Sequence, residues 1–265
     1  MNFRIIGALT LRYLFLYTRS WVRGVEVVFW PMMDLLVWGY LTRFLQQGGA
    51  ANFATPITFL IGAMIFWDVL FRSQQAVAIS FLEDIWTRNL LNVFAAPIRI
   101  TEFLGATFVV GFIRVIVTVL ILAVLASSMY SFNLLTFQLT LLPFFANLLI
   151  FGWALGMIST ALITRWGQAA EGLAWAVPFL IQPVSAVFYP VSVLPYWLQK
   201  LAWVFPSTHV FEGMRDVLAN KGVPWDRLVW SFGLNLIYLA IAGAFFYFML
   251  TMAREKGLLT KLGTQ

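Results

Sequence analysis

The hydrophobic and polar positions of this chain divide it into long apolar segments separated by short polar ones. A helix needs about 20 apolar residues to cross the hydrocarbon layer of a membrane. Six segments meet this length, at residues 25–44, 56–80, 102–126, 137–163, 171–189 and 228–252. The apolar runs are continuous rather than alternating, which favours helices over the strands of a membrane barrel. We therefore predict an all-α integral membrane fold with six transmembrane helices.

The N-terminal segment is apolar but carries regularly placed basic residues. They are Arg4, Arg12, Arg19 and Arg23. At 100° per residue these arginines fall within an arc of about 100°. The pattern favours an amphipathic helix over residues 1–22 that lies in the cytoplasmic interface with its basic side on anionic headgroups. A frayed extension of the first span is the alternative. Residues 23–265 then form the transmembrane domain.

Four ionisable residues lie inside predicted spans. They are Asp34, Asp68, Arg72 and Arg114. Charges at membrane depth are costly, so such residues are functional candidates. Asp68 and Arg72 are four positions apart with the acid first, the better orientation for a helical ion pair. Asp34 is a candidate counter-charge for Arg114. These residues either neutralise one another or form a proton relay, and both readings stay open.

The segment between the second and third spans, residues 81–101, is a polar break that reads FLEDIWTRNLLNVFAAPIRIT. It predicts a short amphipathic helix that ends at Pro97. The side chains expected to face water are Glu83, Asp84, Arg88, Asn89 and Asn92. Those expected to face a partner or the bilayer are Leu90, Leu91, Val93 and Phe94. The segment is either a docking element or a connector that rests on the membrane.

The most unusual stretch is residues 177–218, which starts as a membrane helix and then breaks. It contains five prolines, a short amphipathic piece at 196–204, and the chain's single histidine, His209, followed by Glu212, Arg215 and Asp216. Broken backbone at membrane depth survives only where protein or a water-lined cavity shields it. The stretch therefore indicates a route or gate, and the alternative is a proline-kinked helix followed by an ordinary loop.

Composition supports a single membrane domain. The chain has 265 residues, of which 62% are hydrophobic and 11% charged, whereas soluble domains carry about 25% charge. The absence of cysteine excludes disulfides and thiolate metal sites. With the N-terminus inside, inner segments hold ten Lys and Arg and outer segments five of the 17. This bias predicts cytoplasmic termini, residues 81–101 inside and the broken stretch outside.

The chain shows no signature of catalysis. It has no G-x-x-x-x-G-K-[ST] loop for ATP, no H-E-x-x-H zinc motif and no G-x-S-x-G elbow. With one histidine and no cysteine, we expect no metal site, and we expect His209 to be a polar residue in an outer turn. The two halves also lack repeated broken helices at matching positions, the usual sign of an ion-coupled transporter. An energy source outside the chain fits better.

These features together resemble the membrane subunit of an ABC-2-type exporter. The resemblance covers nearly the whole chain, and its most specific part is the segment FYPVSVLPYWLQKLAWVFPSTHVFEGMR. Family members similarly have a proline-containing stretch after the fifth span, an LP-x-aromatic-LQ piece, an apolar-Pro-small-Thr turn and then a helix with a basic residue, here Arg215. Phe205 departs from the pattern, because the commonest form has Asn before that proline.

The resemblance implies that two copies pair and that each docks a separate nucleotide-binding ATPase. ATP and magnesium would bind that subunit, so this chain would hold no cofactor and have no enzyme activity. The implied coupling residues, in the main coupling helix and in a second contact at 165–168, are Glu83, Asp84, Arg88, Leu90, Leu91, Phe94, Arg99 and Arg165. Residues 193–218 would form two re-entrant helices that close the exit. The implied gate residues are Pro190, Pro195, Trp197, Pro206, His209, Glu212 and Arg215.

The function that the resemblance implies is ATP-driven export of an amphipathic substrate, such as a lipid, a lipid-linked glycan or a hydrophobic drug. The first, second and fifth spans would line the route, in a bacterial inner membrane and in contact with its lipids; no nucleic acid is expected. The first alternative is a stand-alone ion-coupled transporter that uses Asp34, Asp68, Arg72 and Arg114. A membrane-embedded enzyme is the second alternative.

Overall fold

The computed structural model describes residues 1–47, 56–130, 140–219 and 221–257, and within these ranges it contains helices and turns but no strand. The helices are α1 (Phe3–Thr18), α2 (Trp21–Gln47), α3 (Pro56–Trp86), α4 (Leu90–Ala95), α5 (Ile100–Tyr130), α6 (Leu142–Trp166), α7 (Leu173–Ile181), α8 (Tyr196–Ala202), α9 (Pro206–Leu218) and α10 (Trp225–Glu255). Short 3-10 turns lie at Gly167–Ala170 (η2) and Val191–Val193 (η3). The all-α prediction is confirmed.

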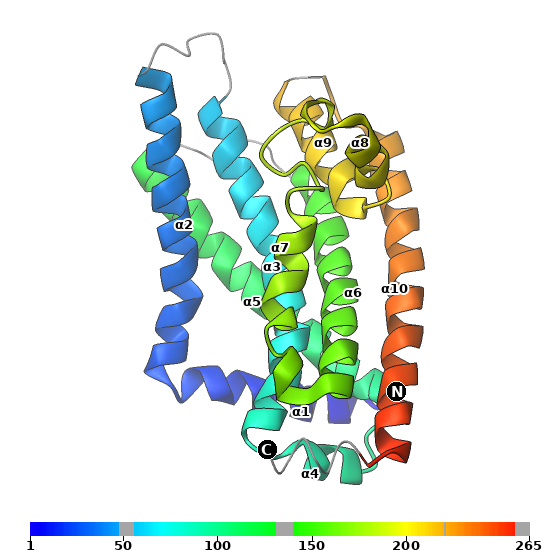
Figure 1. The fold of residues 1–265 in the computed structure, drawn as a ribbon. Helices are drawn as coiled ribbons and strands as arrows, with labels where there is room; N and C mark the ends of the chain where they lie inside the picture. Colours follow the sequence, from blue (N-terminus) through cyan, green and yellow to red (C-terminus); the bar gives the residue numbers. More distant parts are fainter. Residues whose placement is uncertain (48–55, 131–139, 220, 258–265) are drawn as a thin grey trace.

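Among the described residues, four helices are long and apolar enough to cross a membrane: α2, α5, α6 and α10. They identify an integral membrane protein. Helix α3 has 31 residues and runs alongside them (Figure 1). Helix α7 has nine residues, which gives a length of about 14 Å, or half the hydrocarbon thickness. It is therefore much shorter than the span predicted at 171–189. The predicted fourth span begins at 137–139, outside the described residues.

The long helices stand side by side, and the short elements gather at their two ends (Figure 1). Helices α1 and α4 lie at one end, and α8 and α9 lie at the opposite end. The first residues of α1 and the last residues of α10 lie at the same end as α4. This end corresponds to the one that the charge pattern predicts to be cytoplasmic.

Helices α3 and α6 form a close-packed pair in the centre of the bundle. A Cβ atom added at Gly152 would lie 2.6 Å from the carbonyl oxygen of Leu70, and one added at Gly156 would lie 2.8 Å from that of Gln74. The two glycines therefore bring the backbones of α3 and α6 closer than any side chain would allow. They form the small-xxx-small pattern of the fourth predicted span, and its meaning as a packing motif is confirmed.

A second contact fastens α7 to α3. Pro178 lies inside α7 and has no N–H, so the carbonyl of Ala174, four residues earlier, lacks its helical donor. The side chains of Gln74 and Gln75 donate to this oxygen at 3.1 and 2.8 Å. Gln74 also donates to the Ser159 hydroxyl of α6 at 3.0 Å. Both glutamines are fully buried, and they join α3, α6 and α7 around one freed backbone group.

The α3–α6 contact makes a testable prediction about stability. Gly152→Ala should lower the stability of the purified protein in detergent by about 1–3 kcal/mol, because the new methyl group overpacks the interface. The matched control is Gly243→Ala in α10, where nothing lies within 4 Å of the added carbon. The control should instead gain up to about 1 kcal/mol from helix propensity. Thermal unfolding of the two variants checks this, and a shift of the same sign in both would contradict it.

Candidate functional site

The last turn of α3 carries the two acids of the predicted docking segment. Asp84 is fully buried, forms an ion pair with Arg12 and accepts a hydrogen bond from the Tyr13 hydroxyl at 2.7 Å. Glu83 is also buried and lies 3.0 Å from an Arg23 nitrogen. The expectation that both acids face water is therefore wrong, because both pair with basic residues of α1 and α2. Two of the four arginines in the predicted basic arc, Arg12 and Arg23, therefore form ion pairs within the protein.

The two side chains that donate to Asp84 both have raised pKa values. Burial alone would lower the pKa of Arg12, but the hydrogen bond and the negative charge of Asp84 outweigh it and raise the pKa above the usual value. Burial, and after it the charge of Asp84, raise the pKa of Tyr13. Both groups therefore remain protonated donors to Asp84 at neutral pH.

The link from α3 to α4 is a tight turn. Arg88 has a positive φ of 52°, and the Asn89 N–H donates to the Asp84 carbonyl at 2.9 Å. Leu90 and Val93 are 1% and 5% exposed and belong to the main hydrophobic core, so the expectation that they face a partner or the bilayer is wrong. Arg88 and Arg99 are exposed on either side of α4. The side chains of Leu91 and Phe94 lie outside the described residues.

The second predicted contact lies at the same end of the bundle as α4. Arg165 is in the last turn of α6 and is half-buried. One of its guanidinium nitrogens lies 3.3 Å from the Met252 sulfur of α10. Trp86, at the end of α3, donates to Glu171 just before α7 at 3.3 Å. The ends of α3, α6 and α10 and the start of α7 are thus connected here.

Of the four ionisable residues inside the spans, Asp68 and Arg72 form a buried ion pair, and Asp34 and Arg114 lie outside that pair. Arg72 Nε lies 3.2 Å from Asp68 Oδ1, and both side chains are buried, so the predicted helical pair forms. Asp34 is exposed on α2, within electrostatic range of Asp68 and Arg72. Among the described residues no ion pair joins Asp34 to Arg114. The Arg114 guanidinium lies over the Tyr17 ring instead, 4.9 Å from its centre.

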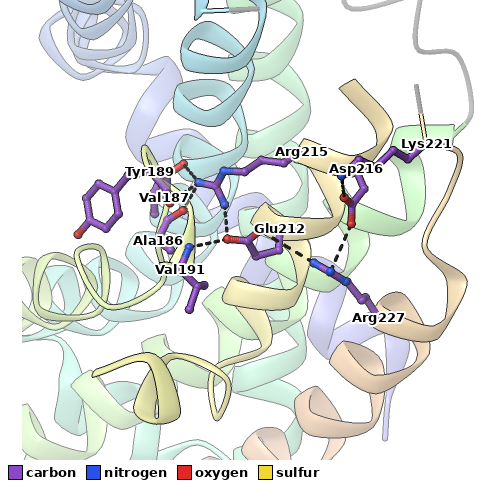
Figure 2. A network of polar contacts seen from close by, with 9 residues as sticks. All are labelled: Ala186, Val187, Tyr189, Val191, Glu212, Arg215, Asp216, Lys221 and Arg227. Carbon is purple, nitrogen blue, oxygen red and sulfur yellow. Dashed lines mark hydrogen bonds and ion pairs between the residues drawn. The ribbon is translucent and has the colours of Figure 1, made fainter. Parts of the chain in front are cut away.

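At the opposite end of the bundle, Arg215 of α9 binds the backbone that follows α7 (Figure 2). It donates to the carbonyls of Ala186, Val187 and Tyr189, at 3.1 Å for Val187 and 2.6 Å for Tyr189. Ala186 has a positive φ of 53°, so the backbone is not α-helical at this position. The carbonyls that follow from Ala186 onward therefore have no intrahelical donors. The guanidinium replaces those donors, since it offers several N–H groups in a fixed geometry.

Acidic residues of α9 extend this contact to α10. Glu212 accepts hydrogen bonds from Arg215 at 2.9 Å and from the Val191 N–H at 2.7 Å. Asp216 lies 3.4 Å from Arg227 of α10 and 3.4 Å from Lys221. Figure 2 shows the resulting row of contacts, from the segment after α7 through α9 to α10. We refer to the contacts of Arg215, Glu212, Asp216, Arg227 and Lys221 as the α9 network.

The other predicted gate residues have different positions. Pro190 and Pro195 precede η3 and α8, and Pro206 is the first residue of α9. A proline fits there because its missing N–H would have no helical partner. Trp197 is 67% exposed on α8. His209 is not in an exposed outer turn as expected. It is 8% exposed in α9, and its Nε2 lies 3.0 Å from the Trp203 carbonyl.

The environment of His209 favours its neutral form. Burial lowers the pKa of His209, the hydrogen bond to the Trp203 carbonyl partly opposes this, and the nearby Arg227 charge lowers it further. The side chain is thus a neutral packing and hydrogen-bonding group at pH 7. Across the residues that the structure describes, no group of three or more His, Asp or Glu side chains could hold a metal ion.

Sequence reasoning missed two sets of contacts that the structure shows. One is the pairing of Arg12 and Arg23 with Asp84 and Glu83. The sequence did contain a sign of this pairing: the N-terminal segment carries arginines, residues 81–101 carry acids, and both segments were expected at the inner side. The other is the binding of Ala174 by two glutamines. Its signal was a Gln-Gln pair inside an apolar span, together with a proline in the middle of another span.

The buried charge pairs and the long apolar helices define a polytopic membrane protein. Comparison with protein families matches residues 35–252 to the family described as "ABC-2 family transporter protein". The match covers most of the chain, and the protein belongs to this family. It is therefore a membrane transport permease.

Two relatives show how far this similarity extends. The chain is 24% identical over 230 residues to the protein named "Inner membrane transport permease YadH" of Escherichia coli K12, covering 84% of this chain and 85% of the relative. It is 25% identical over 174 residues to "ABC transporter G family member 20" of Dictyostelium discoideum. That match covers 63% of this chain but only 23% of the much longer Dictyostelium protein.

The α9 network makes a prediction about Arg215. Arg215→Gln should destabilise the purified protein by about 2–4 kcal/mol, because several buried carbonyls and Glu212 lose a charged donor. Arg215→Lys should recover only part of this, since one ammonium cannot reach all the acceptors. Lys221→Gln, at the exposed end of the same network, should stay within about 0.5 kcal/mol of the wild type. Thermal unfolding in detergent measures all three, and equal losses at 215 and 221 would contradict the assignment.

The buried pair of α3 makes a second prediction. Asp68→Arg and Arg72→Asp should each destabilise the fold by about 3–5 kcal/mol, because each leaves two like charges in a buried site. The double reversal should recover a large part of the loss if the two side chains bind each other. A double-mutant cycle on purified protein measures this coupling. Additive losses would show that the two charges act independently.

Proposed function

We propose that the chain is the permease subunit of an ATP-driven exporter and that α4 is its coupling helix. The observation that carries this is the short, partly exposed helix α4, joined to α3 by a tight turn at the end where the first residues of α1 and the last residues of α10 lie. The similarity to a protein named as an ABC transporter supports an ATPase partner. The similarity to a protein named as an inner membrane permease supports a bacterial inner membrane.

The geometry around α4 suits the transmission of force. A docked ATPase would contact exposed residues such as Arg88 and Arg99, with Arg165 as a second contact. Movement of α4 would reach α3 through the turn at Asn89, and would reach α1 through Asp84 and Arg12. ATP and magnesium would be bound by the partner, and the work of this chain would be to change shape in response.

At the other end, α8 and α9 would form the outer closure of the route. Arg215 and Glu212 tie this closure to the segment after α7, so these residues hold the closed arrangement rather than bind a substrate. We further propose a homodimer, because α2 stands apart in the bundle (Figure 1) with most of its surface uncovered. The substrate class would be amphipathic: a lipid, a lipid-linked glycan or a hydrophobic drug.

One observation favours a second candidate function. Asp34 is exposed on α2, within electrostatic range of the buried pair of Asp68 and Arg72, and an exposed carboxylate at mid-span could carry a proton in a stand-alone transporter. The two candidate functions require different sources of energy. An exporter subunit needs an ATPase, whereas a secondary transporter moves its substrate on an ion gradient alone.

The exporter proposal predicts that a charge on the surface next to α4 matters for coupling. Arg99→Glu should reduce co-purification with the cognate ATPase, and the ATPase activity that the permease supports in liposomes, by about tenfold, the usual scale for an interface charge. The control is Lys256→Glu, an equal charge change at the same end but beyond α10, which should leave both unchanged. Both variants should insert normally.

Two outcomes would contradict the proposal. Unchanged coupling in the Arg99 variant would remove the α4 region from the ATPase contact. Transport by the purified chain on a proton gradient, without any ATPase, would favour the secondary transporter. In that case Asp34→Asn should abolish transport, whereas in the exporter it should leave ATP-dependent activity within about twofold.

A further inference from the structure

The elbow between α1 and α2 contains an open groove of about 620 Å³, which we call the elbow groove. Its polar lining is Ser20 and three arginines, Arg12, Arg19 and Arg23, and its apolar lining includes Leu11, Phe15 and Leu16. All of these residues come from α1, from the short link after it and from the start of α2. Charged and apolar surfaces therefore lie side by side in one concave site.

The charges of the elbow groove are only partly balanced. Arg12 pairs with Asp84, and Arg23 pairs with Glu83. No ion pair joins Arg19 to an acid in the part of the chain that the structure describes, and its guanidinium lies 5.7 Å from the centre of the Phe15 ring. The groove thus keeps a net positive charge, and the exposed guanidinium of Arg19 is the one that no acid of the described residues neutralises.

The surroundings of the groove identify the environment that it faces. Leu11 is 55% exposed, Phe15 is 52% exposed and Trp21, the first residue of α2, is 80% exposed. Large apolar side chains exposed beside arginines, at the end of a membrane span, are typical of a helix at the depth of lipid headgroups. A ligand that suits both kinds of surface has an anionic head and an apolar tail.

We propose that the elbow groove binds one anionic phospholipid. Its phosphate would be held by Arg19, with Arg12 and Arg23 as further donors, because guanidinium groups bind phosphate oxygens in paired hydrogen bonds. One acyl chain would lie along Leu11 and Phe15. Glu83 and Asp84 compete with the phosphate for Arg23 and Arg12, so lipid binding is linked to the end of α3. The inference needs only the membrane location of the chain and does not depend on the exporter role.

The test is direct lipid binding to the purified, delipidated chain in detergent. Native mass spectrometry would compare phosphatidylglycerol with phosphatidylcholine of the same acyl chains. Arg19→Gln should weaken binding of phosphatidylglycerol about fivefold, the effect of one basic residue near an anionic surface. The matched control is Arg4→Gln, an equal charge change at an exposed position of α1 that does not line the groove. The control should bind like the wild type.

Further variants and ligands sharpen the test. Glu83→Gln should strengthen binding of phosphatidylglycerol, since it releases Arg23, and Arg19→Lys should keep most of the affinity. Free glycerol 3-phosphate should not displace the lipid. Equal losses in the Arg4 and Arg19 variants, or equal binding of phosphatidylcholine and phosphatidylglycerol, would overturn the site. Displacement by free glycerol 3-phosphate would overturn the role of the acyl chain.

Discussion

The structure depends on one constraint: every backbone polar group that water cannot reach must find a partner inside the protein. The constraint is easily met within regular helices, and it becomes demanding where prolines interrupt them. At Pro178 the freed carbonyl of Ala174 is bound by Gln74 and Gln75. After Ala186 the freed carbonyls are bound by Arg215. The same problem is thus solved twice, by amides in the bundle centre and by a guanidinium near its end.

These solutions give α3 a central position. It packs against α6 through Gly152 and Gly156, holds α7 through its glutamines, and pairs with α1 through Asp84. Its C-terminal end leads directly into α4. A displacement of α4 would therefore act on the helix that contacts most of the bundle, including the one that leads to the broken segment. In the proposed exporter, α3 is the element that connects the ATPase end to the outer closure.

Each sequence pattern specifies some features of the structure and leaves others open. Apolar length specifies a helix, so α2, α3, α5 and α10 lie at the expected positions, and the spacing of Asp68 and Arg72 specifies their pairing. A proline shows that a donor is missing but not which side chain replaces it, so the roles of Gln74 and Arg215 required tertiary structure. Glu83 and Asp84 were expected to face water because acids next to a span usually do. Their partners lie 60 residues or more away in the chain and could not be read from local pattern.

The α9 network also limits how the proposed closure can open. If α9 moved away alone, the carbonyls of Ala186, Val187 and Tyr189 would lose their donor, and Glu212 would lose its hydrogen bond from the Val191 N–H. Each buried group that loses its hydrogen-bond partner costs about 1–3 kcal/mol. Movement of α9 alone would therefore be unfavourable unless other donors replaced Arg215. We infer that the segment after α7 and α9 move as one body during opening. The hinge would then lie at the α10 edge of this network, where Arg227 contacts Asp216 and Glu212 at longer distances of 3.4 and 4.0 Å.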